Sequence, residues 1–129
     1  MNDTISDFLT RIRNSLMRRN KEVRVPSTNM LVGIAEILKR EGFILDYEVV
    51  EQEPQNELVL RLKYVNGEPA IRALKRISKP GVRKYRGYRK IRAVKNGMGV
   101  GIYSTPKGLI TDKEAKQLKV GGEYICEIY

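Results

Sequence analysis

The chain has 129 residues, 41% hydrophobic and 31% charged, which is enough apolar material for one folded domain or two small ones. Its 25 lysines and arginines outnumber 15 acidic residues, and a formal charge of +10 predicts a polyanionic partner. No apolar run approaches the roughly 20 residues of a membrane-spanning helix, so nucleic acid is favoured over a membrane. The absence of histidine and the single cysteine argue against catalysis, a bound metal, a cofactor or an intramolecular disulfide.

The first half of the chain predicts the element order α-β-α-β-β. Apolar residues at helical spacing indicate two helices, and alternating apolar residues indicate three strands. We expect Asp3 or Thr4 to cap the first helix, Ser27 or Thr28 to cap the second, and Gly42 to end it. The predicted elements are a helix over 3–19, a strand ending at Pro26, a helix from about 29 to 41, and a hairpin of strands 43–50 and 57–64.

The second half predicts a mostly antiparallel β module with one short helix. A turn-rich segment at 65–69 marks the expected boundary between residues 1–66 and 67–129. Thr111 and Glu114 have the spacing of a capping box for the short helix. Strands are expected at 71–77, 82–85, 100–105 and 124–129. The predicted fold class is therefore α+β, built from two small modules.

Charge is distributed unevenly along the chain. Between Pro69 and Thr111 there are twelve lysines and arginines and no acidic residue, whereas Glu41 to Leu60 contains six acids and no base. Like charges at this density oppose folding unless a polyanion normally lies among them. We interpret the basic stretch, which includes Lys79 and Arg83, as a nucleic-acid-binding surface; a solvated charged face is the alternative.

Several side chains are suited to RNA. Tyr85 and Tyr88 lie among the basic residues, where aromatic faces can stack on unpaired bases, whereas Tyr103 is expected to pack inside. The segment Ser104–Gly108 offers hydroxyl groups and an unhindered backbone that can approach a sugar edge, although its spacing fits an ordinary hairpin turn equally well. On the first helix, Arg11, Asn14 and Arg18 share the polar face, which is either solvated or a binding surface.

Four blocks of the chain resemble, in order, the bacterial family of small-subunit ribosomal protein eight. The longest is residues 99–115, with the sequence GVGIYSTPKGLITDKEA. The others are 9–14 (LTRIRN), 75–81 (KRISKPG) and 121–123 (GGE). Four collinear blocks at matching separations form a specific resemblance that covers nearly the whole chain.

The resemblance implies a protein that binds the central domain of small-subunit ribosomal RNA, helps assemble the platform beside neighbouring ribosomal proteins, and catalyses no reaction. It also implies a place in the cytoplasmic ribosome, or in that of an organelle, and in some bacteria repression of translation through the messenger of its own operon. The implied RNA-binding residues, taken with the basic stretch and its loop, are Ser104, Thr105, Pro106, Lys107, Gly108, Tyr85, Arg83, Lys79, Glu123, Thr4, Arg11, Arg13 and Asn14.

The chain departs from the family pattern at a few positions. Thr4 stands where proline is usual, which keeps a cap and loses only a preset dihedral. Asn29 and Leu31 replace lysines, so a phosphate contact before the second helix is not expected. Pro106 replaces serine and removes a hydroxyl and a backbone donor. Other readings are a basic DNA-binding domain, which needs a longer recognition helix, and a nuclease, which needs acids within the basic stretch.

Overall fold

The computed structural model describes residues 3–129, which fold as two compact units. One unit comprises Ile5–Arg72, and the other comprises Ala73–Tyr129 together with Asp3 and Thr4. Both are α+β, which confirms the predicted fold class. Within residues 3–129, no helix has both the length and the apolar character needed to cross a bilayer.

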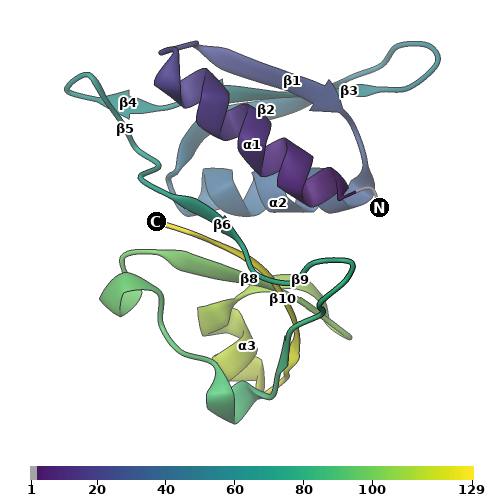
Figure 1. The fold of residues 1–129 in the computed structure, drawn as a ribbon, viewed down its shortest axis with the longest axis vertical. Coiled ribbons are helices and arrows are strands. Elements are labelled where there is room, and N and C mark those ends of the chain that lie inside the picture. Colours follow the sequence, from purple (N-terminus) through teal and green to yellow (C-terminus); the bar gives the residue numbers. More distant parts are fainter. Residues whose placement is uncertain (1–2) are drawn as a thin grey trace. The chain divides into compact units, whose positions relative to one another are not determined.

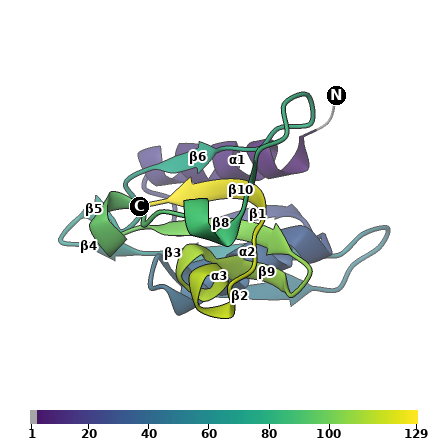
Figure 2. The ribbon, with the colours of Figure 1, turned by 90° about the horizontal axis from the view of Figure 1, so that it is seen from below.

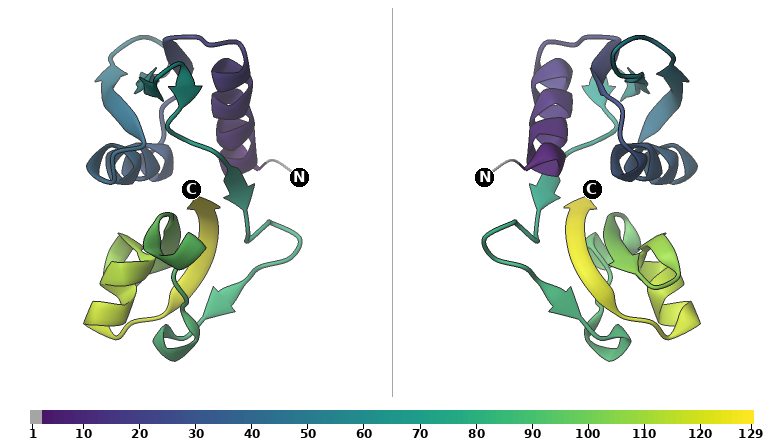
Figure 3. Two further views of the ribbon diagram at one scale, coloured as in Figure 1. Left: turned by 90° about the vertical axis from the view of Figure 1, so that its left-hand side faces the viewer. Right: turned by 90° about the vertical axis from the view of Figure 1, so that its right-hand side faces the viewer.

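The first unit has the predicted order of two helices and three strands. The strands form an antiparallel sheet in the order β1-β3-β2, and both helices lie beside it (Figures 1 and 3). Its elements are α1 (Thr4–Met17), β1 (Glu22–Pro26), α2 (Asn29–Arg40), β2 (Ile44–Val50), β3 (Glu57–Leu62) and the short pair β4 (Tyr64–Val65) and β5 (Glu68–Pro69).

The ends of α2 are set by the residues predicted for them. The side-chain oxygen of Thr28 accepts a hydrogen bond from the Leu31 amide at 3.2 Å, which caps the first turn. Gly42 adopts a φ of +82°, and the Phe43 amide donates to the Leu38 carbonyl oxygen at 2.8 Å. This pattern ends a helix by satisfying carbonyl groups that have no partner further along it.

The three-stranded sheet has one apolar and one charged face. Val25 and Leu58 are paired across β1 and β3 and both are buried, so they belong to the core face. On the other face Val59 is only 1% exposed, because it lies between the long side chains of Arg24 and Glu48 on the neighbouring strands. The apolar body of these charged residues therefore shields the outer face of the sheet.

One predicted strand in this unit is too long. We expected a strand over 57–64, but β3 ends at Leu62 and Tyr64 begins the hairpin β4–β5. Asn66 and Gly67 join these two short strands with φ values of 53° and 80°. Asn-Gly favours such a turn because both residues tolerate positive φ.

The second unit is an antiparallel sheet with one short helix. Strand β10 is central and lies between β6 and β8 (Figure 2). It also pairs with β7 on its β6 side, and β8 pairs with β9. The elements are β6 (Leu74–Arg76), β7 (Tyr85–Arg86), β8 (Val100–Thr105), β9 (Gly108–Thr111), α3 (Asp112–Leu118) and β10 (Gly122–Ile128), with 3₁₀ turns at Tyr88–Lys90 and Lys95–Gly97.

Two strand predictions for this unit need correction, and one strand of the structure was not predicted. The strand expected over 71–77 is confined to Leu74–Arg76, and the one expected over 82–85 is found at Tyr85–Arg86. Residues between them form a turn closed by Lys79 and Val82 instead. Strand β9 was not expected, because four residues directly before a helix show too little alternation to indicate a strand.

The core of the second unit is built around two tyrosines. The rings of Tyr103 and Tyr124 stack with centroids 4.5 Å apart and planes 13° apart, and Ile91, Ile110 and Ala115 complete the cluster. Tyr103 is fully buried, which confirms that it packs inside. The predicted capping box is also present: Thr111 accepts from the Glu114 amide and the Glu114 side chain accepts from the Thr111 amide.

Candidate nucleic-acid interface

Three residues expected to contact RNA lie side by side on neighbouring strands. Glu123 of β10 is directly opposite Tyr85 of β7 on one side and Ser104 of β8 on the other. Side chains of directly opposed residues lie on the same face of a sheet. The next pair, Tyr103 and Tyr124, faces the core, so the row formed by Tyr85, Glu123 and Ser104 faces outward. We call these three residues the outer row.

The segment Ser104–Gly108 is the turn of the β8–β9 hairpin. The Thr105 hydroxyl donates to the Gly108 carbonyl oxygen at 2.9 Å and accepts from the Lys107 amide at 3.0 Å. Gly108 has a φ of +104°, and Pro106 precedes Lys107 in the exposed part of the turn. Proline after the first residue and glycine at the fourth are favoured in such turns.

The two hydroxyl groups of this hairpin therefore differ in role. Thr105 is engaged within the turn, whereas the Ser104 hydroxyl has no hydrogen bond to another group in residues 3–129. Ser104 is half-buried on the outer row, while Pro106, Lys107 and Gly108 are exposed. The turn geometry predicted as an alternative to binding is present, and it also leaves Ser104 available to a ligand.

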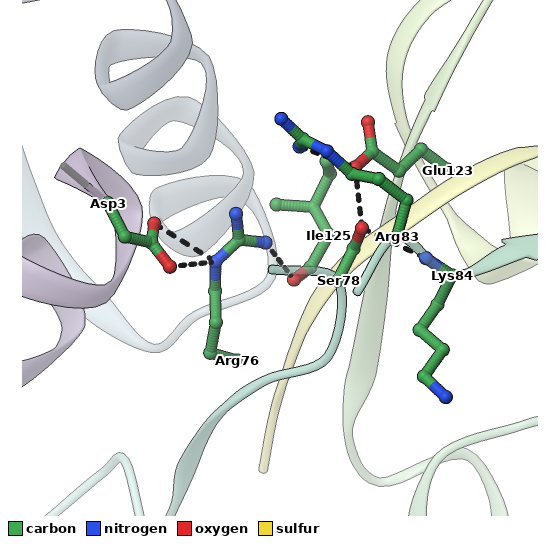
Figure 4. Close-up of polar contacts among 7 residues, drawn as sticks. All are labelled: Asp3, Arg76, Ser78, Arg83, Lys84, Glu123 and Ile125. Carbon is green, nitrogen blue, oxygen red and sulfur yellow. Dashed lines mark hydrogen bonds and ion pairs between the residues drawn. The ribbon is translucent and has the colours of Figure 1, made fainter. Parts of the chain in front are cut away.

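Glu123 is held in place by two donors (Figure 4). Its Oε2 accepts a hydrogen bond from the Ser78 hydroxyl at 2.5 Å and from Arg83 Nη1 at 2.9 Å. Burial by itself raises the pKa of Glu123, but the hydrogen bonds from Ser78 and Arg83 outweigh it, so that the pKa lies below its ordinary value. The carboxylate is therefore ionised at neutral pH and can only accept hydrogen bonds.

Two bases of the basic stretch form ion pairs with carboxylates of the protein itself. Arg76 donates to both carboxylate oxygens of Asp3, at 3.3 and 3.2 Å, and to the Ile125 carbonyl oxygen at 2.6 Å (Figure 4). Arg83 pairs with Glu123. The remaining ten are exposed, and none has a carboxylate partner among residues 3–129: Arg72, Lys75, Lys79, Lys84, Arg86, Arg89, Lys90, Arg92, Lys95 and Lys107.

Some of these bases lie against aromatic rings. The guanidinium of Arg86 is 5.2 Å from the centroid of the Tyr124 ring, and that of Arg89 is 5.6 Å from the Tyr88 ring. Lys95 lies 4.5 Å from the Tyr129 ring. Such contacts hold the cations at the surface without neutralising them. Tyr85, by contrast, is 69% exposed, and its ring is available for stacking.

In the first unit, the polar face of α1 borders a hollow of about 430 Å³. Arg11, Asn14 and Arg18 line it, as their helical spacing predicted, together with Arg24 of β1. Arg11 Nε lies 3.1 Å from Asp7, and Arg24 is paired with Glu22 and Glu57 at 3.0 and 2.9 Å. These guanidinium groups are thus partly compensated by the protein's own carboxylates.

The structure does not bring all N-terminal candidates together. Arg13 follows Arg11 by two residues and lies about 200° further around the helix, so it does not line the hollow. Thr4, at the exposed start of α1, is also outside it. The sequence analysis did not predict that Arg24 lies beside this face, because Arg24 is on β1 and the other arginines of the hollow are on α1. Its place between Val23 and Val25 indicated only that its side chain points outward.

The α+β fold exposes ten bases that have no carboxylate partner among residues 3–129, and one of its sheets carries an outward row of tyrosine, carboxylate and serine. These features define a basic protein with a surface suited to a polyanion. Residues 3–129 match the family described as "Ribosomal protein S8". The chain belongs to this ribosomal protein family, as the four blocks indicated.

Relatives from bacteria extend the same match over the full chain. Each carries the name "Small ribosomal subunit protein uS8". The Geobacter sulfurreducens protein is 52% identical over 130 residues, covering 100% of this chain and 98% of its own. Those of Lactobacillus helveticus and Azobacteroides pseudotrichonymphae are 51% and 48% identical, covering 100% of this chain and 98% and 100% of theirs. These names denote ribosomal proteins and not enzymes, which confirms the expected non-catalytic class.

Proposed function

We propose that this protein is a structural constituent of the small ribosomal subunit and binds small-subunit ribosomal RNA through the outer row and the β8–β9 hairpin. The observation that carries the proposal is the alignment of Tyr85, Glu123 and Ser104 on one outward face. The named relatives are small-subunit proteins, which supports the same partner. Because those relatives are bacterial, we propose a ribosome of the bacterial cytoplasm.

The chemistry of the surface favours RNA held by more than its phosphates. Exposed bases such as Lys79 and Lys107 supply charge, which gives affinity without sequence preference. The Ser104 hydroxyl and the backbone at Gly108 are small enough to approach a 2′-hydroxyl, and Tyr85 offers a ring face to an unpaired base. Glu123 repels phosphate, and thus favours a hydroxyl or amino donor at its position.

We assign a secondary contact to the first helix. Thr4, Arg11, Arg13 and Asn14 are all exposed, and Arg11 and Asn14 border the hollow on the polar face of α1. Because Arg11 is already paired with Asp7, its phosphate contact should be weaker than that of an uncompensated base. We retain the division of the chain into residues 1–66 and 67–129 as a proposal about which parts carry the secondary and the main contact.

The RNA element that we propose is a helical segment in the central domain of the small-subunit RNA, bound early in assembly of the platform. The test compares the affinity for a central-domain RNA fragment with that for duplex DNA of equal length across a salt series. We expect tighter binding to the RNA, by at least tenfold at physiological salt. Equal affinities with equal salt slopes would instead favour a general polyanion binder. A DNA-reading domain is disfavoured because α3 has only seven residues.

We further propose that the same surface binds a segment of the protein's own messenger when that segment has the shape of the ribosomal site. Binding at one surface makes the two RNAs mutually exclusive. An unlabelled messenger segment should therefore displace the central-domain fragment, with the Ser104→Ala variant weakened toward both. Simultaneous binding of the two RNAs would contradict this. We also propose that neighbouring small-subunit proteins contact this protein on the surfaces that RNA does not cover.

A further inference from the structure

Ser78 is a buried polar residue that is not among the proposed RNA contacts. The residue is 0% exposed, and it lies two positions after the last residue of β6. It precedes a tight turn in which the amides of Lys79 and Val82 each donate to the other's carbonyl oxygen at 3.0 Å. A hydroxyl buried at such a position requires hydrogen-bond partners, because leaving it unpaired is costly.

The Ser78 hydroxyl joins two separate segments of the second unit. It donates to Oε2 of Glu123 at 2.5 Å and accepts from the Lys84 amide at 3.1 Å (Figure 4). The backbone reinforces the same junction: the Ser78 amide donates to the Tyr124 carbonyl oxygen at 3.0 Å, and the Tyr124 amide donates to the Lys84 carbonyl oxygen at 2.9 Å. One side chain thus fixes the ends of the segment 78–84 and the carboxylate of β10.

We propose that Ser78 is a positioning residue for the RNA-binding surface. It orients Glu123, the centre of the outer row, and the hydrogen bond that it accepts from the Lys84 amide directs its own hydroxyl proton toward Glu123. This inference rests on the proposed function, since it concerns the same surface. It adds a residue that does not itself touch RNA.

The geometry at Glu123 explains why such positioning matters. Ser78 and Arg83 both donate to Oε2, whereas Oε1 has no partner among residues 3–129 and points away from Ser78 in Figure 4. Oε1 is therefore the acceptor left for a hydroxyl or amino group of RNA. Arg83 is exposed, so a phosphate can compete with Glu123 for its guanidinium, whereas the Ser78 hydroxyl is buried and donates its proton to Glu123. The serine provides the orientation that remains once RNA is bound.

A double-mutant cycle on the full chain tests this role. Affinity for the central-domain RNA fragment is measured for the wild type, Ser78→Ala, Glu123→Ala and the double variant. If Ser78 acts through Glu123, Ser78→Ala alone weakens binding roughly tenfold, but adds less than about twofold when Glu123 is already absent. The salt slope should not change in Ser78→Ala, because serine carries no charge and does not contact phosphate.

Thr111→Ala is the matched control. It also removes a buried hydroxyl from the second unit, at the cap of α3, and it leaves the outer row intact. Its affinity for the RNA fragment should equal that of the wild type at a temperature where both are folded. A similar loss in Thr111→Ala and Ser78→Ala would show a general effect of lower stability, and would overturn the inference.

The outcomes separate this inference from the proposed function. If Glu123→Ala weakens binding while Ser78→Ala does not, or if their effects add fully, Ser78 is not a positioning residue and the RNA surface stands. If neither these variants nor Ser104→Ala alters binding, the proposed surface itself fails.

Should Ser78→Ala not fold, the carboxyl carbon of Glu123 is titrated by NMR in the wild type. Titration at or above the ordinary glutamate pKa would overturn the inference, because a Ser78 bond to the ionised form lowers it.

Discussion

Gly122 lies against Ser104 so closely that a Cβ atom on Gly122 would come within 2.1 Å of the Ser104 carbonyl oxygen. Its neighbour Gly121 would bring a Cβ within 2.4 Å of the Arg86 carbonyl oxygen. These glycines are therefore required by the close approach of β7 and β8 to β10. The spacing of the outer row depends on two residues that carry no side chain.

Gly122→Ala should separate β8 from β10 at Ser104. A methyl group cannot occupy a space already filled by backbone, so we expect a loss of about 3 kcal/mol in the free energy of unfolding, at the upper end for overpacking. Urea denaturation measures it. Gly87→Ala is the control, because a Cβ there meets nothing within 4 Å, and its effect should stay within about 0.5 kcal/mol. Equal stability of the two variants would contradict the close packing.

Tyr103→Phe and Tyr124→Phe should change stability in opposite directions. The Tyr103 hydroxyl is buried and has no hydrogen-bond partner among residues 3–129, whereas the Tyr124 hydroxyl donates to Glu127 Oε2 at 2.6 Å. Removing an unpaired hydroxyl should stabilise the protein by about 1 kcal/mol, and removing a paired one should cost about as much. Both changes keep the stacked rings, so urea denaturation compares the hydroxyl groups alone. A loss for Tyr103→Phe would indicate a partner for that hydroxyl.

Ser104→Ala and Thr105→Ala should separate binding from stability. Ser104 has no hydroxyl partner within the described chain, so its removal should leave the free energy of unfolding unchanged and weaken RNA binding about five- to tenfold. Thr105 closes the hairpin turn, so its removal should cost about 1 kcal/mol of stability as well. Thermal unfolding and RNA titration on the same samples measure both.

The salt dependence supplies the control for this pair. Neither hydroxyl releases counterions, so the salt slope of RNA binding should match that of the wild type in both variants. Lys107→Gln, on the same exposed turn, should instead reduce the slope by about one. If the slope collapses in Ser104→Ala, the hairpin acts only through its electrostatic field.

The stability contributed by Glu123 should depend on pH in the acid range. Its pKa in the folded protein is below the unperturbed value of 4.5, so the unfolded chain takes up the proton first as pH falls. The stability that ionised Glu123 contributes is therefore complete above pH 4.5, the unperturbed pKa, and is lost as the pH falls through the lower pKa of the folded protein. Urea denaturation from pH 7 to pH 3 should show the wild type and Glu123→Gln converging at low pH. Thr111→Ala is the control: it removes no titratable group, so its stability should differ from that of the wild type by the same amount at every pH. A constant difference for Glu123→Gln would contradict the lowered pKa of Glu123.

Local signals predicted much of the fold. The helix α2 begins after Thr28 and ends before Gly42 as expected, and Thr111 starts α3, because capping residues and positive φ act within a few positions of the chain. Strand β8 covers the predicted 100–105. The short strands β6, β7 and β9 were misjudged, because their extent is set by pairing with distant segments and not by their own alternation.

The candidate site was predictable in composition but not in arrangement. Tyr85, Ser104 and Glu123 were each named from the resemblance or their chemistry, yet no spacing along the chain indicates that they are cross-strand neighbours. Their alignment follows from the register of β10 with β7 and β8. Ser78 was not named at all, since its partner Glu123 is 45 positions away and only the fold brings them together.

The central place of β10 also orders the events of synthesis. Strands β6, β7 and β8 all precede β10 in the chain, but each takes it as a neighbour in the sheet. While the chain is being translated, β8 and β9 can close as a local hairpin, whereas Tyr85 has no strand beside it until residues 122–128 have left the exit tunnel. A nascent chain interrupted before Gly122 would therefore expose its basic stretch without the outer row. Such an intermediate would adhere to RNA by charge and lack the means to choose among RNAs.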